Sequence, residues 1–406
     1  MKRVIFFLLC FLISQVPAFA APDLQMQVQE LKQMVQELRQ TVNRQQDEID
    51  TLKSASTAAM PPEAAPPSTQ PQPISASSGK WNPDIGVIAD TLFKLDSPKD
   101  DTSGADRLSV RELELVIGSY VDPFSRMDVN IAFSDLDEAE LSEAYLTRFG
   151  LPWETTARVG RFKPKFGKAP MYHRDILDTV DEPLAVVRYF GEEGLNKTGI
   201  DFTKPLDLPL DSSHEIVVGV LEGGVGEGGN ALGTTRRRPT VYSHLRNFWD
   251  LADVTTYELG LSHMIGSQDE DASLEVNILG IDSTLIHLAG PDQRIKWQSE
   301  LFIVDRDQTT PGLEDTTLGA YSVFDYRFSK QWSAGARVDY VELIDNPLTN
   351  PEDSDYGYTG YVTFYQTDFA RWRLQLNHWE LASGKDDNQV MIQGIFAIGD
   401  HKHKLQ

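Results

Sequence analysis

Cysteine is almost absent from this chain of 406 residues, in which Cys10 is the single thiol. Cys10 lies in an apolar stretch at the N-terminus, so we expect the mature chain to contain no thiol. Disulfide bonds and cysteine-ligated metals are therefore excluded from the fold. A lipoprotein anchor on Cys10 is not expected, because too little apolar segment precedes it.

Long hydrophobic runs and basic residues are also scarce. After the N-terminal stretch there is no further run of about 18 apolar residues, so no transmembrane helix is expected. Lys and Arg number 37 against 61 Asp and Glu, which gives a net charge of −24. This acidic balance argues against nucleic acid as a partner.

The first 20 residues have the three parts of a secretory signal peptide. Lys2 and Arg3 form a basic start, residues 4–13 are apolar, and Ala18 and Ala20 supply the small residues before a cleavage site. The apolar run is too short for a comfortable transmembrane helix. We therefore expect residues 1–20 to be removed during export and exclude them from the fold.

Residues 21–53 carry a heptad repeat that predicts a periplasmic coiled coil. One core position holds leucine and the other a β-branched residue, a pairing typical of coiled-coil seams that does not decide between dimer and trimer. A single amphipathic helix packed on the next domain is the alternative. The Pro/Ala/Ser-rich residues 54–80 favour the coiled coil, since they predict an extended linker. The two core positions are Leu24, Leu31, Leu38, Gln45 and Leu52, and Val28, Val35, Val42 and Ile49.

Residues 81–406 consist of short segments in which apolar and polar residues alternate. Met127, Val129 and Phe133 share one face of such a segment, while Asp128 and Asn130 share the other. Segments of roughly ten residues with aromatic residues near their ends are typical of an antiparallel transmembrane β-barrel, apolar toward lipid and polar toward the lumen. A soluble β-sandwich or β-helix is the alternative, because soluble sheets also alternate.

The number and spacing of these segments favour the barrel. If the first strand runs outward, the inward-side links are brief, as at 121–123, 329–330 and 367–369, and the outward-side links are longer. Short periplasmic turns and long external loops are the rule in such barrels. We predict about 16 strands, which start near residues 85, 107, 124, 140, 156, 197, 214, 240, 254, 272, 293, 316, 331, 356, 370 and 388.

The stretch ARVGRFKPKFG at 157–167 ends the fifth predicted strand. By alternation Arg161 and Lys163 share a face with Val159, so they lie either at the outer headgroup boundary or, if Gly160 introduces a bulge, in the pore. The longest link, 166–196, follows; general porins fold a segment into the lumen at this point. Its apolar residues predict an in-folded constriction loop, with a loop packed over the barrel mouth as the alternative. The candidate pore or constriction residues are Arg161, Lys163, Lys165, Lys168, Arg174, Asp178, Asp181 and Arg188.

One part of the chain begins at Glu143, continues through Leu151-Pro152 and ends with VGRFKPKFG at 159–167. This part resembles the G-x-F-K-P-P-F-G region of the phosphate-selective porin O/P family. The resemblance is specific over residues 140–167 and only architectural elsewhere. It implies a 16-stranded outer-membrane porin, usually trimeric. Members with phosphate selectivity line their pores with arginines and lysines, whereas this domain is acidic, so phosphate selectivity is not carried over. Arg236, Arg237 and Arg238 lie in a predicted external loop, where solvation or lipopolysaccharide contact is expected.

No catalytic constellation, cofactor motif or secure metal site is found in the sequence. His401 and His403, in the tail after the last predicted strand, are metal ligands only if further ligands join them. Selectivity is therefore expected from the side chains that line the pore. They carry both signs, with acids ahead, which predicts weak cation preference or little preference. The inward candidates are Asp128, Glu258, Glu275, Lys296, Glu300, Arg337, Asp339 and Arg373.

Together these patterns predict a non-enzymatic porin of the bacterial outer membrane. We expect passive diffusion of small polar or ionic solutes through a barrel narrowed by the loop after strand five. The expected partners are further copies of the chain in a homotrimer, outer-membrane lipid and lipopolysaccharide, and peptidoglycan. The alternative function is an envelope tether, in which the coiled coil binds peptidoglycan or a periplasmic partner and the barrel only anchors it.

Overall fold

The computed structural model describes residues 83–96, 107–134, 139–192, 194–208, 212–224, 229–233, 235–308, 316–344, 354–384 and 386–399. The chain divides into two compact units, Met1–Gln72 and Pro73–Gln406, and all described residues belong to the second unit. The predicted signal peptide, coiled coil, linker and histidine-containing tail lie outside the described residues. No helix within the described segments is long and apolar enough to cross a membrane.

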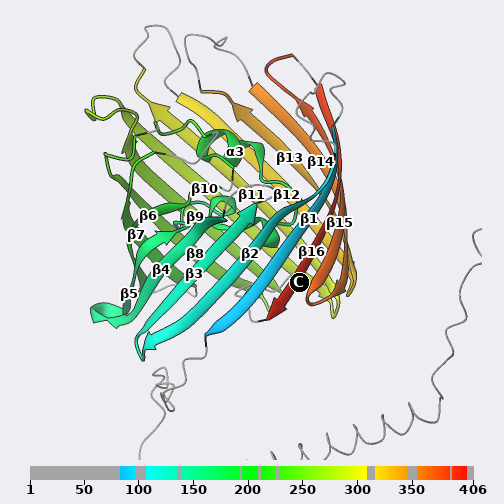
Figure 1. Cartoon of the computed structure of the whole chain (residues 1–406), viewed down its shortest axis with the longest axis horizontal. Helices are drawn as coiled ribbons and strands as arrows, with labels where there is room; N and C mark the ends of the chain where they lie inside the picture. Colours follow the sequence, from blue (N-terminus) through cyan, green and yellow to red (C-terminus); the bar gives the residue numbers. More distant parts are fainter. Residues whose placement is uncertain are drawn as a thin grey trace, which may run out of the picture. The chain divides into compact units, whose positions relative to one another are not determined.

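The described strands close into one antiparallel barrel, in which each strand pairs with its neighbours in sequence and β1 pairs with β16 (Figure 1). The predicted barrel is thus confirmed. The largest error in a predicted strand start is at β10, expected near 272 and found at Glu275. The strands are β1 Asp84–Asp96, β2 Arg107–Asp122, β3 Ser125–Ser134, β4 Ala139–Leu151, β5 Thr155–Phe162, β6 Lys197–Leu206, β7 Ser213–Leu221, β8 Thr240–Ala252, β9 Thr255–Ser267, β10 Glu275–Gly290, β11 Gln293–Arg306, β12 Thr316–Ser329, β13 Trp332–Glu342, β14 Ser354–Thr367, β15 Ala370–Glu380 and β16 Asp386–Gly399.

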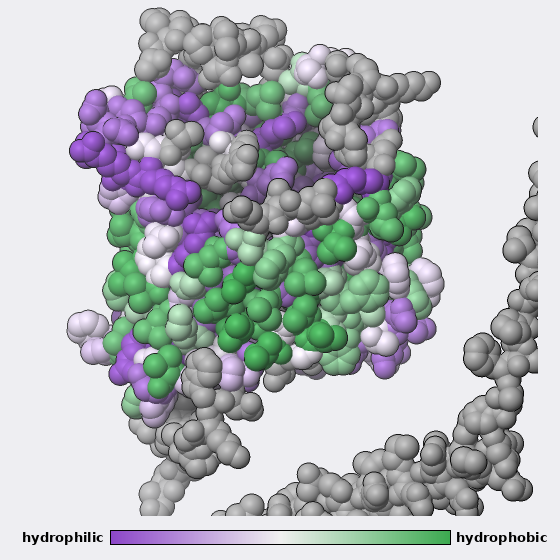
Figure 2. Space-filling model, viewed as in Figure 1, coloured by the Kyte–Doolittle hydropathy of each residue, from purple (hydrophilic) through white to green (hydrophobic). Residues whose placement is uncertain are grey.

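Side chains alternate between the outer surface and the lumen as the period of a β-strand requires. In β3, Met127 and Phe133 are exposed on the outside, whereas Asp128 and Asn130 face the lumen and are buried. In β13, Trp332 and Val338 face out while Arg337 faces in. Hydrophobic residues cover much of the barrel wall, and hydrophilic residues gather above it in the view of Figure 2.

The links between strands differ at the two ends of the barrel. At one end, β2–β3, β8–β9, β10–β11, β12–β13 and β14–β15 are joined by turns of two residues each. At the same end, the short helix η1 (Pro152–Glu154) joins β4 to β5. The β6–β7 link at this end spans 207–212, and most links at the other end are longer, among them 222–239 and 163–196. This asymmetry follows the predicted parity of short turns and long loops.

The main apolar core lies inside the barrel. The 163–196 loop contains the short helices η2 (Ala169–Met171), η3 (Arg174–Ile176) and α3 (Leu184–Phe190), and Figure 1 shows α3 within the ring of strands. Phe166, Tyr189 and Phe190 of this loop are fully buried against inward-facing wall residues that include Phe302 and Ile278. Phe190 and Phe302 pack edge to face with 5.1 Å between ring centroids. The loop is therefore held inside the barrel by hydrophobic burial as well as by polar contacts.

Candidate functional site

The loop turns into the lumen at Gly167 and is fixed to the wall there. Gly167 has φ +66°, a left-handed conformation that favours glycine, and a Cβ at this position would collide with the carboxylate of Glu300. The Gly167 N–H donates to Ser262 Oγ on β9 at 2.9 Å. The N–H groups of Lys168 and Ala169 donate to Glu300 Oε1 and Oε2 on β11 at 2.6 and 3.0 Å. Three consecutive backbone donors thus bind the wall, and Glu300 accepts two of them.

The lysines near this turn pair with carboxylates of the wall. Lys168 Nζ forms an ion pair with Glu258 on β9, and Glu258 also pairs with Arg246 on β8 at 2.7 Å. Lys165 pairs with Glu215 on β7 at 2.7 Å. The two lysine pairs join the loop to the β7–β9 side of the lumen.

His173 connects the loop to the β2–β4 side of the barrel. Its Nδ1 lies 3.6 Å from Glu114 Oε1 on β2, and its Nε2 lies 3.4 Å from Glu143 Oε2 on β4. Burial by itself would lower the pKa of His173, and nearby Lys163 opposes its protonation. The two carboxylates outweigh both effects and raise the pKa of His173 to about 10. His173 belongs to the loop and to none of the barrel strands, and its raised pKa favours the protonated form at neutral pH.

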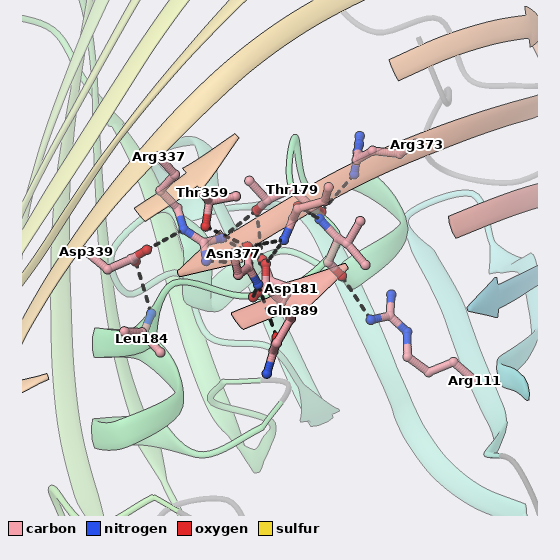
Figure 3. Close-up of polar contacts among 12 residues, drawn as sticks. Arg111, Thr179, Asp181, Leu184, Arg337, Asp339, Thr359, Arg373, Asn377 and Gln389 are labelled. Carbon is pink, nitrogen blue, oxygen red and sulfur yellow. Dashed lines mark hydrogen bonds and ion pairs between the residues drawn. The ribbon is translucent and has the colours of Figure 1, made fainter. Parts of the chain in front are cut away.

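The segment from Thr179 to Asp181 contacts wall residues of β13 and β15 (Figure 3). Asp178 pairs with Lys296 on β11 at 2.6 Å. Thr179 Oγ1 accepts a hydrogen bond of 2.7 Å from Arg337, and its carbonyl oxygen accepts one of 2.8 Å from Arg373.

The backbone of Val180 is held from two strands. Its carbonyl oxygen accepts a hydrogen bond from Arg111 on β2 at 2.9 Å, while its N–H donates to Gln375 on β15 at 2.7 Å. The Val180 side chain packs with Leu92 of β1 and Met391 of β16. The loop therefore touches both the β1–β2 wall and the β11–β16 wall.

Helix α3 is capped by a wall residue instead of by its own sequence. Pro183 precedes the helix and has no side-chain hydrogen bond to give, and Asp339 Oδ1 on β13 accepts the Leu184 N–H at 3.1 Å. At the other end of the helix, Arg188 pairs with Asp355 on β14 at 2.7 Å. Asp339 is also bound by Arg337 at 2.7 Å, so one carboxylate joins the cap to a buried cation.

The structure separates the candidate residues predicted from sequence. Arg161 lies on the same face as outward-facing Val159, in register with Ala144 and Thr198, and pairs with Glu140 at 3.5 Å and Glu222 at 3.7 Å. Lys163 is buried, and its backbone N–H binds Glu143.

The other candidates all lie on the loop. Arg174 pairs with Glu182 at 3.7 Å and with Glu192 at 3.6 Å. Asp181 accepts hydrogen bonds from Asn377 and Gln375 on β15. The candidates that bind inward-facing wall residues are Lys163, Lys165, Lys168, Asp178, Asp181 and Arg188.

One inward assignment is wrong. Glu275 shares its strand parity with the outward-facing Leu279 and Ile281, while Val276 and Ile278 face the lumen. The rule that polar residues face the lumen fails in this part of β10 because its inward residues pack against the apolar side of the loop. The remaining inward candidates face the lumen as expected.

Several loop-binding wall residues were not singled out from the sequence. Arg371, Gln375 and Asn377 share the inward face of β15 with Arg373, so the period-two pattern of that strand already indicated that they face the lumen. Arg111 gave no such signal, because a register shift between Asp90 and Thr91 reverses the alternation of β2 beside it. Among the described residues, no group of three or more His, Cys, Asp or Glu side chains is arranged to hold a metal ion.

No family model matches the sequence. An uncharacterized protein from Aquifex aeolicus strain VF5 is 25% identical over 321 residues, which cover 71% of this chain and 68% of that protein. The fold is similar to that of an anion-selective porin from Comamonas acidovorans, with a TM-score of 0.53 and 11% identity over 78% of this chain and 99% of the porin. It is also similar to that of the outer membrane channel DcaP of Acinetobacter baumannii, with a TM-score of 0.51 and 11% identity over 78% of this chain and 96% of DcaP. At such identities the likeness concerns the fold, which is that of porins and outer-membrane channels.

Proposed function

We propose that this chain is an outer-membrane porin through which small polar or ionic solutes diffuse passively, with the loop after β5 setting the width of the pore. The observation that carries the proposal is a loop anchored inside a closed barrel whose lumen is lined largely by polar residues. The exposed apolar residues on the outside of the strands suit contact with lipid. The porin and channel with similar folds support the same function.

The charges along the loop favour weak ion selectivity. Most of its ionic groups are matched by partners of opposite sign, as in the Lys296–Asp178 and Arg188–Asp355 pairs. Paired charges contribute less field to a passing ion than unpaired rings do. We therefore propose that the pore has weak cation preference or little preference. We propose that the resemblance to phosphate-selective porins concerns ancestry and architecture only and does not extend to phosphate selectivity.

We further propose that the chain assembles as a homotrimer, as the resemblance implies, with the predicted coiled coil in the periplasm.

Arg237 and Arg238, in the link between β7 and β8, interact with Glu270 of the β9–β10 link, and the Arg237 side chain is 74% exposed. This basic surface is suited to the phosphates of lipopolysaccharide.

Swelling of proteoliposomes in neutral sugars of increasing size tests diffusion directly. The purified full-length protein is expected to admit small sugars and to exclude larger ones progressively. Equal swelling with and without protein, when heat-modifiable electrophoretic mobility shows a folded barrel, would contradict the porin proposal.

A further inference from the structure

Four acceptor oxygens without a hydrogen-bond partner lie on the lumenal side of β10 and β11, next to the root of the loop. They are both carboxylate oxygens of Asp282, the hydroxyl oxygen of Thr284 and the amide oxygen of Gln298. The three side chains are 1%, 6% and 4% exposed. A buried acceptor without a donor costs free energy, most of all when it is a carboxylate.

The strand register brings these groups together with a second carboxylate. Asp282 is the partner of Glu300, and Thr284 is the partner of Gln298, across the β10–β11 pair. Directly opposed residues on one face of an antiparallel pair have Cβ atoms about 4.5–5.5 Å apart. Two carboxylates and two neutral oxygens thus occupy two adjacent cross-strand positions.

Hydrogen bonds fix the orientation of the Gln298 amide. The Tyr321 hydroxyl donates its single proton to Glu300 Oε2 at 2.9 Å, because a carboxylate only accepts. Tyr321 must therefore accept the 2.6 Å hydrogen bond from Gln298, which identifies the donating atom as Nε2. Gln298 Oε1 is consequently the amide atom that has no partner.

Glu300 keeps capacity for one more ligand. Its Oε2 accepts from Tyr321 and Ala169, whereas its Oε1 accepts only from Lys168. Each carboxylate oxygen has about two lone-pair positions, so one position on Oε1 stays available.

Gly260 makes room for the Asp282 carboxylate. It is the β9 partner of Asp282, and a Cβ at residue 260 would overlap the carboxylate oxygens. The space that a side chain would fill is thus occupied by a charged group from the next strand.

The charges around Asp282 do not balance. The carboxylates of Glu258, Asp282 and Glu300 face two cations, Lys168 and Arg246, and both cations are bound to Glu258. The opposed Asp282 and Glu300 therefore need a further positive charge. A proton would satisfy one acceptor, whereas a metal cation takes several oxygens at once, including the neutral ones.

We propose that Asp282, Glu300, Thr284 and Gln298 form a binding site for a hard, oxygen-ligated divalent cation of the Ca²⁺ type at the root of the loop. Ca²⁺ accepts carboxylate and neutral oxygens in an irregular arrangement and completes its shell with water, whereas Mg²⁺ requires a near-octahedral one. The bound cation bridges β10 and β11 behind the carboxylate that holds Lys168 and Ala169, and so stabilises the anchored loop.

Terbium luminescence on the full-length protein in detergent tests this site, because Tb³⁺ substitutes for Ca²⁺ and is sensitised by a nearby tyrosine such as Tyr321. Asp282→Asn retains the shape of the side chain and removes its charge. Native protein is expected to give a signal that Ca²⁺ displaces and Na⁺ does not. In Asp282→Asn the competing affinity of Ca²⁺ should fall by at least about 10- to 100-fold, the loss that removal of an outer-shell partner alone causes at metal sites.

Two further variants make the test selective. Asp128→Asn removes a lumenal carboxylate that is already paired with Arg126 at 3.0 Å, and its displaceable signal should equal that of native protein. Thr284→Val removes one neutral ligand and should weaken Ca²⁺ competition even if Asp282→Asn fails to fold. A Ca²⁺-displaceable signal that is equal in native protein, Asp282→Asn and Thr284→Val would overturn the proposal, as would the absence of any such signal. A stability that depends on pH at Asp282 and on no added cation would assign the site to a proton instead.

Discussion

At the residue scale, Arg337 is placed where a charge is tolerated only with full pairing. It is 1% exposed and binds Asp339, Thr179 and the carbonyl oxygen of Asp181. Removing one member of a buried pair leaves the other charge without compensation, which costs far more than losing a pair at the surface.

We expect Arg337→Met to reduce the free energy of unfolding by about 3–5 kcal/mol, because Asp339 would remain buried and unpaired. Denaturant unfolding in micelles, followed by tryptophan fluorescence, measures the change. Arg148→Met is the matched control, since Arg148 pairs with Asp122 at an exposed turn and should cost about 0–1 kcal/mol. Equal losses of unfolding free energy in the two variants would show that the buried Arg337–Asp339 pair contributes no more to stability than an exposed pair.

His173 makes the stability of the folded chain depend on pH, and the sign of this dependence follows from the raised pKa of His173. The pKa is about 10 in the folded chain against an ordinary value of 6.5, so protonation favours the folded state. This stabilisation is complete below pH 6.5 and is lost as the pH rises toward 10.

Between pH 7 and 10, native protein should lose thermal stability relative to His173→Gln, because the variant has no imidazolium to deprotonate between Glu114 and Glu143. Melting temperatures of both proteins across this interval provide the measurement. Melting temperatures that change in parallel with pH in the two proteins would indicate that His173 is not protonated between Glu114 and Glu143.

At the element scale, the strands could be predicted from sequence, but their loop contacts could not. The alternation of apolar and polar residues with a period of two identifies the strands. Two-residue turns, such as the one before Trp332, mark where the strands end. Alternation failed at Glu275, where the lumenal face is apolar, and gave no signal at Arg111, beside a bulge. The two failures have different causes: the inward face of β10 packs against a loop that is distant in sequence, whereas the register shift beside Arg111 changes the parity of β2.

The position of the loop could be inferred from its length and apolar content, whereas its anchors could not. Glu300 and Asp339 alternate like any lumenal residue, and nothing in their sequence context shows that each accepts backbone N–H groups of the loop. Such acceptor roles depend on three-dimensional placement alone.

Shortening the loop tests its role in setting the pore. A Gly/Ser bridge from Tyr172 to Pro183, which line one cavity together, replaces 173–182 and retains the α3 residues that pack in the core. We expect single-channel conductance to rise, because the segment that reaches Arg111, Arg337 and Arg373 would be gone. Shortening the β9–β10 link at 270–273 is the control and should leave conductance as it is. The loop has no constricting role if both variants conduct like native protein.

At the scale of the whole molecule, the predicted coiled coil separates the porin proposal from the envelope tether. Deleting residues 21–80 while keeping the signal peptide should leave the permeability of each barrel unaltered, since the lumen is built from later residues. Uptake of small polar solutes and resistance of the cells to detergent are measured together. Unaltered uptake with a loosened envelope would favour the tether, and unaltered behaviour in both assays would leave the barrel as the functional part.

Single-channel recording of the purified full-length protein in planar bilayers tests the central proposal most directly. A water-filled barrel narrowed by an anchored loop should give discrete, reproducible conductance steps, with a small reversal potential in a salt gradient. The absence of discrete channels from protein shown to be folded would contradict passive diffusion through this barrel.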